Sequence, residues 1–560
     1  SLILSLVLIM GLVPPVVFAA PMEELWVNGV DILSAENNTV ACGSGKAIYD
    51  PTTATLTLDN AVIETPNNGR GIFKNGASDT TNKLIIQLIG DNKIIANEMN
   101  PIQSGIYSGG TVSIQGEGSL LIETAYESSN PYGIYAFSGC AINNSRITLR
   151  DTSGSDPSFS SGIDVNGTKA SLKINSANIT IDGYVIGINV PSGDVTVKGS
   201  SITVTNADNG ISGGNVIDNF IIEGSVLDFT GDGVTSVGLL NGHEIQIDSS
   251  LVKILSKNSN AIYTDGAISV RNGSVLELTG FYPALFSTLD TIITNSTMKA
   301  FSTDDSGIYS RANIIINGTS DILARGHWAG INANGNITIN SGKVYSTSSN
   351  DMGIYLRGIF TMNGGDLYAQ GAQGFAAIGA RYTKQDGDTN PIEKIKVNSN
   401  YAEVSVSDWF TGSSEGIPWS RSWTSFVARD DDKLASDRSN ALNEITIKIK
   451  PADYTAVDGA IAKIPGDLSN YTNESVKVVN DAKSDVIRGK DITEQSVVDG
   501  YAKAIEDAVG ALALKAADYS KVEEAIAKIP ADLSIYTEAT VNAVTAAKDA
   551  VVRGRVITEQ

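Results

Sequence analysis

A short apolar phrase recurs along most of the chain at a nearly fixed interval, and this repeat restricts the possible folds. In each copy a small residue precedes Ile or Leu, and a turn rich in Gly or Asn follows. From Leu239 to Ile378 the interval is 23 residues in every step except the last, which is 24. The apolar anchors are Ile72, Ile106, Ile134, Ile163, Ile188, Ile211, Leu239, Ile262, Leu285, Ile308, Ile331, Ile354 and Ile378. Such a repeat is typical of units that bury their apolar face only by stacking on neighbours.

Three short strands with alternating inward residues fit within each interval, separated by Gly, Asn and Ser turns. The inward positions predicted for the coils from Ala261 onward are Ile268, Thr291, Ile314, Ile337 and Phe360, then Val270, Ile293, Ile316, Ile339 and Met362, then Val275, Met298, Asp321 with its neighbour Ile322, Val344 and Leu367. Asn317, Asn340 and Asn363 share one turn position, where stacked amides can hydrogen-bond along the stack.

The pattern predicts a mainly β chain folded as a parallel β-helix with about 23 residues per coil. Leucine-rich repeats need Leu at fixed offsets and a helical side, and propeller blades need longer repeats with antiparallel pairs. We expect a right-handed β-helix, because parallel crossover connections are almost always right-handed.

The opening of the repeat region has its own motif. The segment GSGKAIYDPTTATLTLDNAVI spans 43–63, and Gly71-Ile72 and the phrase IGDNKI at 89–94 follow it. These motifs resemble those of bacterial surface proteins labelled carbohydrate-binding, which have a pectate-lyase-like right-handed parallel β-helix. The resemblance covers about Leu25 to Lys450 and implies a polysaccharide ligand.

The two ends of this region differ from its middle. Residues 1–19 contain an apolar run and a small-x-small cleavage site, which predict a signal peptide that lacks its N-terminal part. The protein is therefore expected to be exported. Residues 20–42 are assigned to an N-terminal cap, 43–406 to the β-helix, and 407–450 to a C-terminal cap and last strand. Apart from the leader, no stretch is long enough to predict a membrane span.

After Pro451 the periodicity becomes helical, and a sequence repeat with an offset of 65 residues begins. ADYTAVDGAIAKIPGDLSNYT starts at Ala452, and ADYSKVEEAIAKIPADLSIYT starts at Ala517. The first copy, 451–515, predicts helices over 454–464, 472–488 and 493–514, with Thr472 and Thr493 as N-caps. It resembles the FIVAR-type three-helix modules of Gram-positive surface proteins; the second copy, 516–560, is expected to be truncated.

Composition excludes several classes of function. The chain has 40 Lys and Arg against 62 Asp and Glu, a formal net charge of −22. Nucleic-acid binding needs a clustered basic excess, so it is not expected. Two Cys exclude a disulfide scaffold, and two His leave little room for a His-based metal site. Cys140 is expected to be a buried free thiol, too far from Cys42 to form a bridge.

We identify no catalytic residues in the sequence. Polygalacturonase-like sites combine an Asp pair with Gly-His-Gly and R-x-K phrases on adjacent coils. This combination is incomplete in this chain. Asp304-Asp305 is the candidate pair on a coil, Glu244 follows His243, and Trp328 follows His327. Calcium is the only cofactor considered, at Asp208, Asp228 and Asp232, although such proximity is expected by chance among 62 acidic residues.

Aromatic residues are the candidate ligand-binding groups. Tyr107, Tyr135, Tyr263, Tyr309 and Tyr355 each follow an anchor and are expected to form one outward column. This column either stabilises the sheet by stacking or serves as a platform for sugars. Trp328 is expected in an exposed turn, either as a sugar subsite or folded against the coil. Trp409, Trp419 and Trp423 either cap the open end of the β-helix or stack on sugar rings.

These features favour a secreted, cell-surface, non-catalytic polysaccharide-binding protein, with helical modules as a spacer toward a Gram-positive cell wall. The first alternative is a surface adhesin or structural stalk that binds a protein partner. The second is a polysaccharide lyase or glycosidase with an unfamiliar site, since β-helices host such enzymes.

Overall fold

The computed structural model describes residues 24–96, 102–125, 131–153, 159–216, 219–229, 237–239, 244–372, 377–380, 395–397, 402–406 and 444–560. The chain divides into two units, Ser1–Lys448 and Ile449–Gln560. The predicted signal peptide and Trp409, Trp419 and Trp423 lie outside the described residues, as do Asp232 and His243.

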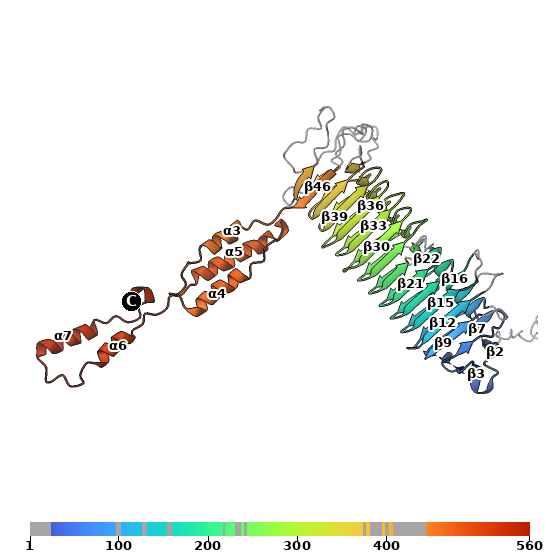
Figure 1. Ribbon diagram of the computed structural model, residues 1–560, viewed down its shortest axis with the longest axis horizontal. Coiled ribbons are helices and arrows are strands. Elements are labelled where there is room, and N and C mark those ends of the chain that lie inside the picture. Colours follow the sequence, from blue (N-terminus) through green and yellow to red (C-terminus); the bar gives the residue numbers. More distant parts are fainter. Residues whose placement is uncertain are drawn as a thin grey trace, which may run out of the picture. The chain divides into compact units, whose positions relative to one another are not determined.

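The first unit is a parallel β-solenoid built from three long sheets (Figure 1). Sheet A has 15 strands in the order β2 (Val30–Asp31), β1 (Leu25–Val27), β7 (Arg70–Lys74), β10 (Ser104–Ser108), β13 (Tyr132–Ala136), β16 (Ser161–Val165), β19 (Ile186–Ser192), β22 (Asn209–Val216), β25 (Val237–Leu239), β28 (Ile262–Thr264), β31 (Leu285–Ser287), β34 (Ile308–Ser310), β37 (Ile331–Ala333), β40 (Ile354–Leu356) and β43 (Ile378–Ala380).

Sheets B and C are built in the same way. Sheet B has 16 strands, β3 (Thr39–Cys42), β4 (Gly45–Asp50), β5 (Thr55–Asp59), β8 (Lys83–Ile89), β11 (Thr111–Gln115), β14 (Gly139–Asn143), β17 (Ser171–Asn175), β20 (Val195–Lys198), β23 (Phe220–Glu223), β26 (Glu244–Asp248), β29 (Ala267–Arg271), β32 (Thr291–Thr294), β35 (Ile314–Asn317), β38 (Ile337–Ile339), β41 (Phe360–Met362) and β44 (Ile395–Val397). Sheet C has 15 strands, β45 (Ala402–Val406), β46 (Glu444–Ile449), β42 (Asp366–Gln370), β39 (Lys343–Ser348), β36 (Asp321–Gly326), β33 (Thr297–Ser302), β30 (Val275–Gly280), β27 (Leu251–Leu255), β24 (Val226–Phe229), β21 (Ser201–Thr205), β18 (Asn178–Asp182), β15 (Arg146–Asp151), β12 (Ser119–Thr124), β9 (Asp91–Ile95) and β6 (Val62–Ile63).

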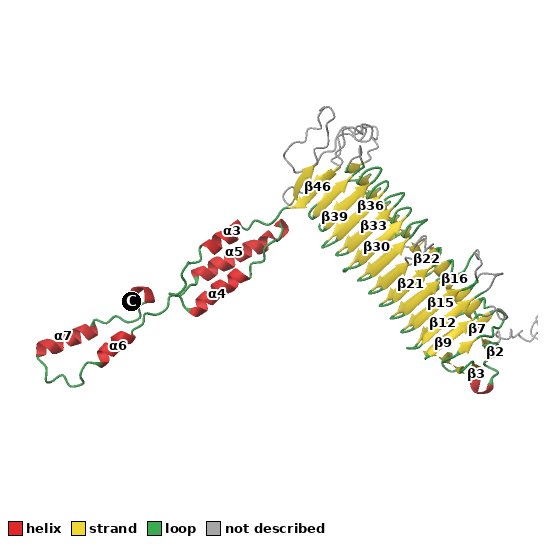
Figure 2. Cartoon of the chain, in the orientation of Figure 1, coloured by secondary structure: helices red, strands yellow, loops and turns green. Residues whose placement is uncertain are grey.

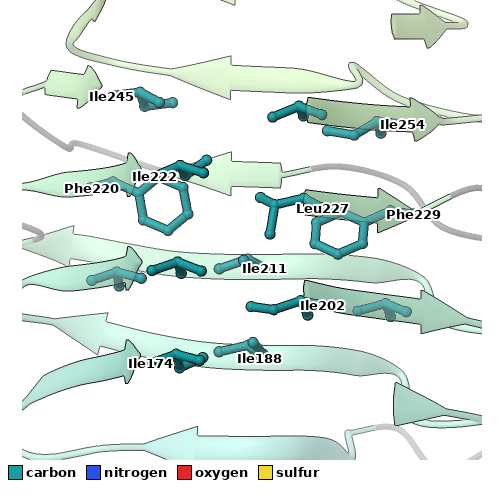
Figure 3. Packing of buried hydrophobic residues seen from close by; sticks show 14 of the residues in the cluster. Ile174, Ile188, Ile202, Ile211, Phe220, Ile222, Leu227, Phe229, Ile245 and Ile254 are labelled. Carbon is teal, nitrogen blue, oxygen red and sulfur yellow. The ribbon is translucent and has the colours of Figure 1, made fainter. Parts of the chain in front are cut away.

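Each coil contributes one strand to each sheet, and turns line the edges of the stack (Figure 2). Equivalent residues pair in parallel along the stack, as Ile262 with Leu285 and Leu285 with Ile308. Every anchor whose side chain the structure describes is buried, as are the predicted inward residues of sheet B. The interior is apolar, and Figure 3 shows Phe220, Leu227 and Phe229 from β23 and β24 within it. The parallel β-helix is therefore confirmed, while its right-handedness stays a prediction.

One inward position on sheet C was predicted wrongly. Leu276, and not Val275, is buried and pairs with Met298. The preceding turn contains two residues with positive φ, Asn272 at 57° and Gly273 at 77°. The longer turn displaces the strand by one residue, and a one-residue shift sends each side chain to the opposite face.

Antiparallel strands lie at both ends of the solenoid. β1 pairs antiparallel with β7 and β2, and β4 pairs antiparallel with β3 and β5. The short helix η1 (Glu36–Asn38) precedes β3. At the other end β46 pairs antiparallel with β42. These strands cover edges that would otherwise expose unpaired backbone groups.

The second unit is helical. It contains α3 (Thr455–Ala462), α4 (Asn473–Ser484), η2 (Ile492–Glu494), α5 (Gln495–Gly510), α6 (Ser520–Ala527), α7 (Glu538–Asp549) and η3 (Ile557–Glu559). Val457 and Ala460 of α3 pack with Val498, Ala502 and Ile505 of α5 in a small core. Within the described part of the chain, no helix has the length and apolar character needed to cross a membrane.

The N-caps of these helices confirm one prediction and correct another. The Thr472 hydroxyl accepts a hydrogen bond from the backbone N–H of Ser475, as an N-cap does. Thr493 is not a cap, because the side chain of Asp491 accepts a hydrogen bond from the Thr493 N–H. An Asp two residues earlier provides the acceptor, so the cap lies before the predicted position.

Candidate functional site

The predicted tyrosine column is interrupted on the outer face of sheet A. Tyr107 and Tyr135 stack with ring centroids 4.7 Å apart, but the next paired residue is Asp164. Tyr263 begins a second aromatic group, in which it stacks on Phe286 at 4.8 Å. A single continuous column is therefore not formed, because Asp164, Asn189 and Ser212 occupy the outward positions on the next three coils.

In the second group, Tyr263 and Tyr309 form hydrogen bonds and ring contacts with other side chains of the protein. Tyr263 donates a hydrogen bond to Asp265 Oδ1 at 3.0 Å, and Asn334 Nδ2 donates one to the Tyr309 hydroxyl at 3.2 Å. Phe286, between them, is only 6% exposed, and its ring lies edge to face with that of Tyr309, with centroids 5.2 Å apart. Burial raises the pKa of the Tyr263 hydroxyl. A sugar needs a free ring face, and Tyr263 already stacks one face on Phe286, so these contacts support the structural role.

Tyr355 differs from Tyr263 and Tyr309 in its neighbours. Its paired residues in sheet A are Asn332 and Gly379, so no aromatic side chain occupies the adjacent outward positions. Its side chain is half-buried. Of Tyr263, Tyr309 and Tyr355, only Tyr355 has no aromatic residue paired with it on the described strands of sheet A.

Trp328 is the most exposed predicted aromatic residue that the structure describes. It lies in the turn between β36 and β37, with 58% of its surface exposed. The neighbouring His327 places Nδ1 3.3 Å from the Ser349 hydroxyl. The exposed indole agrees with the predicted exposed turn and leaves ring surface available to a ligand.

Two further exposed aromatic residues share this corner of the solenoid. Phe281 and Tyr282 are 38% and 48% exposed, and their rings meet edge to face at 5.2 Å. They were not identified from the sequence, although a signal was present. Tyr282 precedes the anchor Leu285 by the same three positions that separate Trp328 from Ile331.

Backbone hydrogen bonds stack these turns directly on one another. We name the pairs 281–282, 304–305, 327–328 and 350–351, which lie on four consecutive coils, the turn ridge. Its hydrogen bonds run from Asp304 N to Phe281 O at 3.0 Å, from Trp328 N to Asp305 O at 3.1 Å, and from Asn350 N to His327 O at 3.0 Å. The spacing between neighbouring turns is therefore that of the strands, about 4.8 Å.

Two serine hydroxyls fix the aromatic turns of the ridge. Ser302 Oγ donates to the carbonyl oxygens of Phe281 and Tyr282, at 3.0 and 2.9 Å. Ser348 Oγ makes the equivalent bonds to His327 and Trp328, at 2.8 and 3.1 Å. Each aromatic turn is thus held by the coil that follows it, which limits the loss of conformational freedom on binding.

Carboxylates lie between the aromatic turns. Asp304 is exposed, and Asp305 is half-buried, with Oδ1 accepting hydrogen bonds from the N–H and hydroxyl of Ser306 at 2.6 and 3.0 Å. Burial raises the pKa of Asp305, and the adjacent Asp304 adds to that effect. Exposed rings beside carboxylate acceptors suit a ligand with apolar C–H faces and many hydroxyl groups.

Comparison with known proteins adds no relative. No protein-family model, curated protein sequence or solved structure matched the chain.

The predicted calcium ligands do not gather in the described part of the chain. Asp208 is exposed in the turn before β22, whereas Asp228 lies on β24, paired with Thr203 and Lys253. No group of three or more His, Cys, Asp or Glu side chains among the described residues could hold a metal ion. The described residues give the calcium prediction no support.

Both cysteines are free and buried, as predicted for Cys140. Burial raises the pKa of Cys42 to about 11 and that of Cys140 to about 12. A thiol with a raised pKa is a poor nucleophile, so these cysteines belong to the core.

Proposed function

We propose that this chain is a secreted, cell-surface protein that binds polysaccharide and does not cleave it. The observation that carries the proposal is the turn ridge, where Tyr282 and Trp328 expose ring surface on a backbone fixed by hydrogen bonds. Sugar rings have apolar C–H faces that stack on such side chains. A repetitive solenoid suits a repetitive polymer, because several weak contacts add along the chain.

The helical unit is proposed as a spacer made of three-helix modules, repeated every 65 residues. The two copies share their internal contacts. Tyr454 donates to Ile487 O at 2.8 Å, and Tyr519 donates to Val552 O at 3.1 Å. Together with the predicted signal peptide, these modules support a place at a Gram-positive cell wall. The resemblance of the repeat region to carbohydrate-binding surface proteins supports the same proposal.

A glycan array probed with the purified chain, with and without calcium, tests this function. We expect binding to at least one class of polysaccharide. Incubation of the same protein with pectin, cellulose and xylan is expected to release neither reducing ends nor unsaturated sugars. Product release would identify an enzyme instead. An empty array combined with capture of a defined surface protein would favour an adhesin.

A further inference from the structure

The turn ridge alternates two kinds of surface from one coil to the next. Tyr282, Asp305, Trp328 and Asp351 each lie three positions before the buried anchor of their coil. The order along the ridge is therefore aromatic, acidic, aromatic, acidic. Its period is two coils, which corresponds to roughly 10 Å at the usual strand spacing.

An extended β-1,4-linked chain of pyranose sugars has a matching alternation. Each sugar advances such a chain by a length comparable to one strand spacing, and successive sugars turn opposite faces to the same side. A chain lying along the stack thus presents equivalent C–H faces to Tyr282 and Trp328. The sugar between them presents its hydroxyl groups beside Asp304 and Asp305, where carboxylate oxygens accept hydrogen bonds.

We propose that the turn ridge binds an uncharged, extended β-1,4-linked oligosaccharide, with one sugar per coil and alternate sugars stacked on Tyr282 and Trp328. This inference rests on the polysaccharide-binding function proposed above and names its site and ligand class. Exposed Asp304 and half-buried Asp305 disfavour a uronic acid, because two like charges would meet beside the rings.

Length dependence provides a direct test with the full chain. A two-sugar ligand reaches one ring, whereas a three-sugar ligand reaches both. We expect isothermal titration calorimetry to show an affinity gain of about tenfold from two to three sugars. The probes are the β-1,4-linked di- and trisaccharides of glucose, mannose and N-acetylglucosamine, and the gain is expected in at least one series.

Variants at the turn ridge test whether the affinity gain from two to three sugars arises there. Tyr282→Ala and Trp328→Ala should each abolish the difference between the two- and three-sugar ligands. Leu289→Ala is the matched control, because Leu289 is 53% exposed in a turn at another corner, and it should keep the gain. Maltotriose, which is α-linked, and trigalacturonate, which is charged, should bind at least about tenfold more weakly than the best β-1,4-linked trisaccharide.

The possible results distinguish the proposed ridge site from the broader proposal of polysaccharide binding. If the variants keep the gain, if no β-1,4-linked series shows one, or if maltotriose or trigalacturonate binds equally well, the ridge proposal is wrong. A positive glycan array would then still support polysaccharide binding elsewhere on the chain. If no glycan binds at all, both proposals are wrong.

Discussion

At the residue scale, buried serines link consecutive coils at the corner between sheets B and C. The side chain of each accepts a hydrogen bond from a backbone N–H one coil earlier and donates to a carbonyl of its own turn. The N–H to Oγ bonds run from Ala177 to Ser200, Ser200 to Ser225, Ser225 to Ser250, Ser250 to Ser274 and Ser296 to Ser320, at 3.1 to 3.4 Å. Such bonds satisfy backbone donors that the strands leave unpaired.

The Ser225→Ala substitution tests this ladder. Ser225 is 2% exposed, and its hydroxyl accepts from Ser200 N at 3.2 Å and donates to Glu223 O at 2.8 Å. Removing it leaves a buried N–H without a partner, so we expect a loss of about 1 to 3 kcal/mol in the free energy of unfolding. Urea denaturation measures the loss. The control Ser201→Ala, on the outer face of β21, should change stability little; equal losses would contradict the ladder's role.

Asp164 gives a second test through pH. It is fully buried beside Asn189, whose Nδ2 donates to Oδ2 at 3.2 Å, and burial raises its pKa from 3.8 to about 6. The folded chain therefore retains this proton up to a higher pH than the unfolded chain. Stability from this group is lost as pH rises from about 4 to 6.

Asp164→Asn should remove that loss. We expect it to raise stability by about 2 to 3 kcal/mol at pH 8 and to change it little at pH 4. Thermal melting at the two pH values measures the difference. Asp208→Asn, at an exposed position, is the control and should show no such dependence. A stabilisation equal at both pH values would show that ionisation of Asp164 is not its cause.

Some side-chain contacts were predictable from the sequence and others were not. Asn340 and Asn363 donate to Asn317 and Asn340 at 2.8 and 2.7 Å, as their shared register predicted. The serine ladder was missed because serine is common in every turn, so its register is hard to distinguish. Tyr282 could be recognised only by comparing turns across coils, because it lies three positions before Leu285, as Trp328 lies before Ile331.

At the element scale, period-two and helical patterns placed most strands and helices correctly, and errors arose where turn length varied. The pattern predicts Val275 as inward, but the turn before it is one residue longer than in the next coil, so Leu276 is the buried residue. Helices were predicted over 472–488 and 493–514 but span Asn473–Ser484 and Gln495–Gly510. Helix ends depend on capping by individual side chains, which periodicity does not reveal.

The helical repeat predicts unequal stability for its two copies. In the first, α5 contributes Val498, Ala502 and Ile505 to the core, whereas α6 and α7 of the second bury no residue. We therefore expect residues 452–514, expressed alone, to show a helical circular dichroism spectrum and a cooperative melt. Residues 516–560 alone should be largely unfolded. A random-coil spectrum for 452–514 would contradict the proposed module.

At the scale of the whole solenoid, every coil depends on its immediate neighbours. Sheets A, B and C pair equivalent residues in parallel over most of their length, so stability is close to a sum of coil and interface contributions. The fixed interval made this architecture predictable from the sequence. The repeat does not predict a function in the same way, because it specifies buried positions and leaves the exposed turn residues free to vary.

Such a molecule should respond locally to a buried charge. Ile316 of β35 is fully buried and pairs with Ile293 and Ile339, in the coils that carry the turn ridge. Ile316→Asp places an unpaired charge in the apolar interior, which costs several kcal/mol. We expect faster hydrogen exchange in β32, β35 and β38 and loss of oligosaccharide binding at the ridge.

The matched variant is Ile114→Asp, because Ile114 of β11 is equally buried and pairs with Ile86 and Ile142, in coils toward the other end of the solenoid. Its effect should be confined to β8, β11 and β14, with ridge binding retained. Hydrogen–deuterium exchange mass spectrometry measures both patterns. If either variant unfolded all three sheets together, the coils would form one cooperative unit, and the nearest-neighbour description would be wrong. Local loss of protection around each site would show that the turn ridge depends only on the coils that adjoin it.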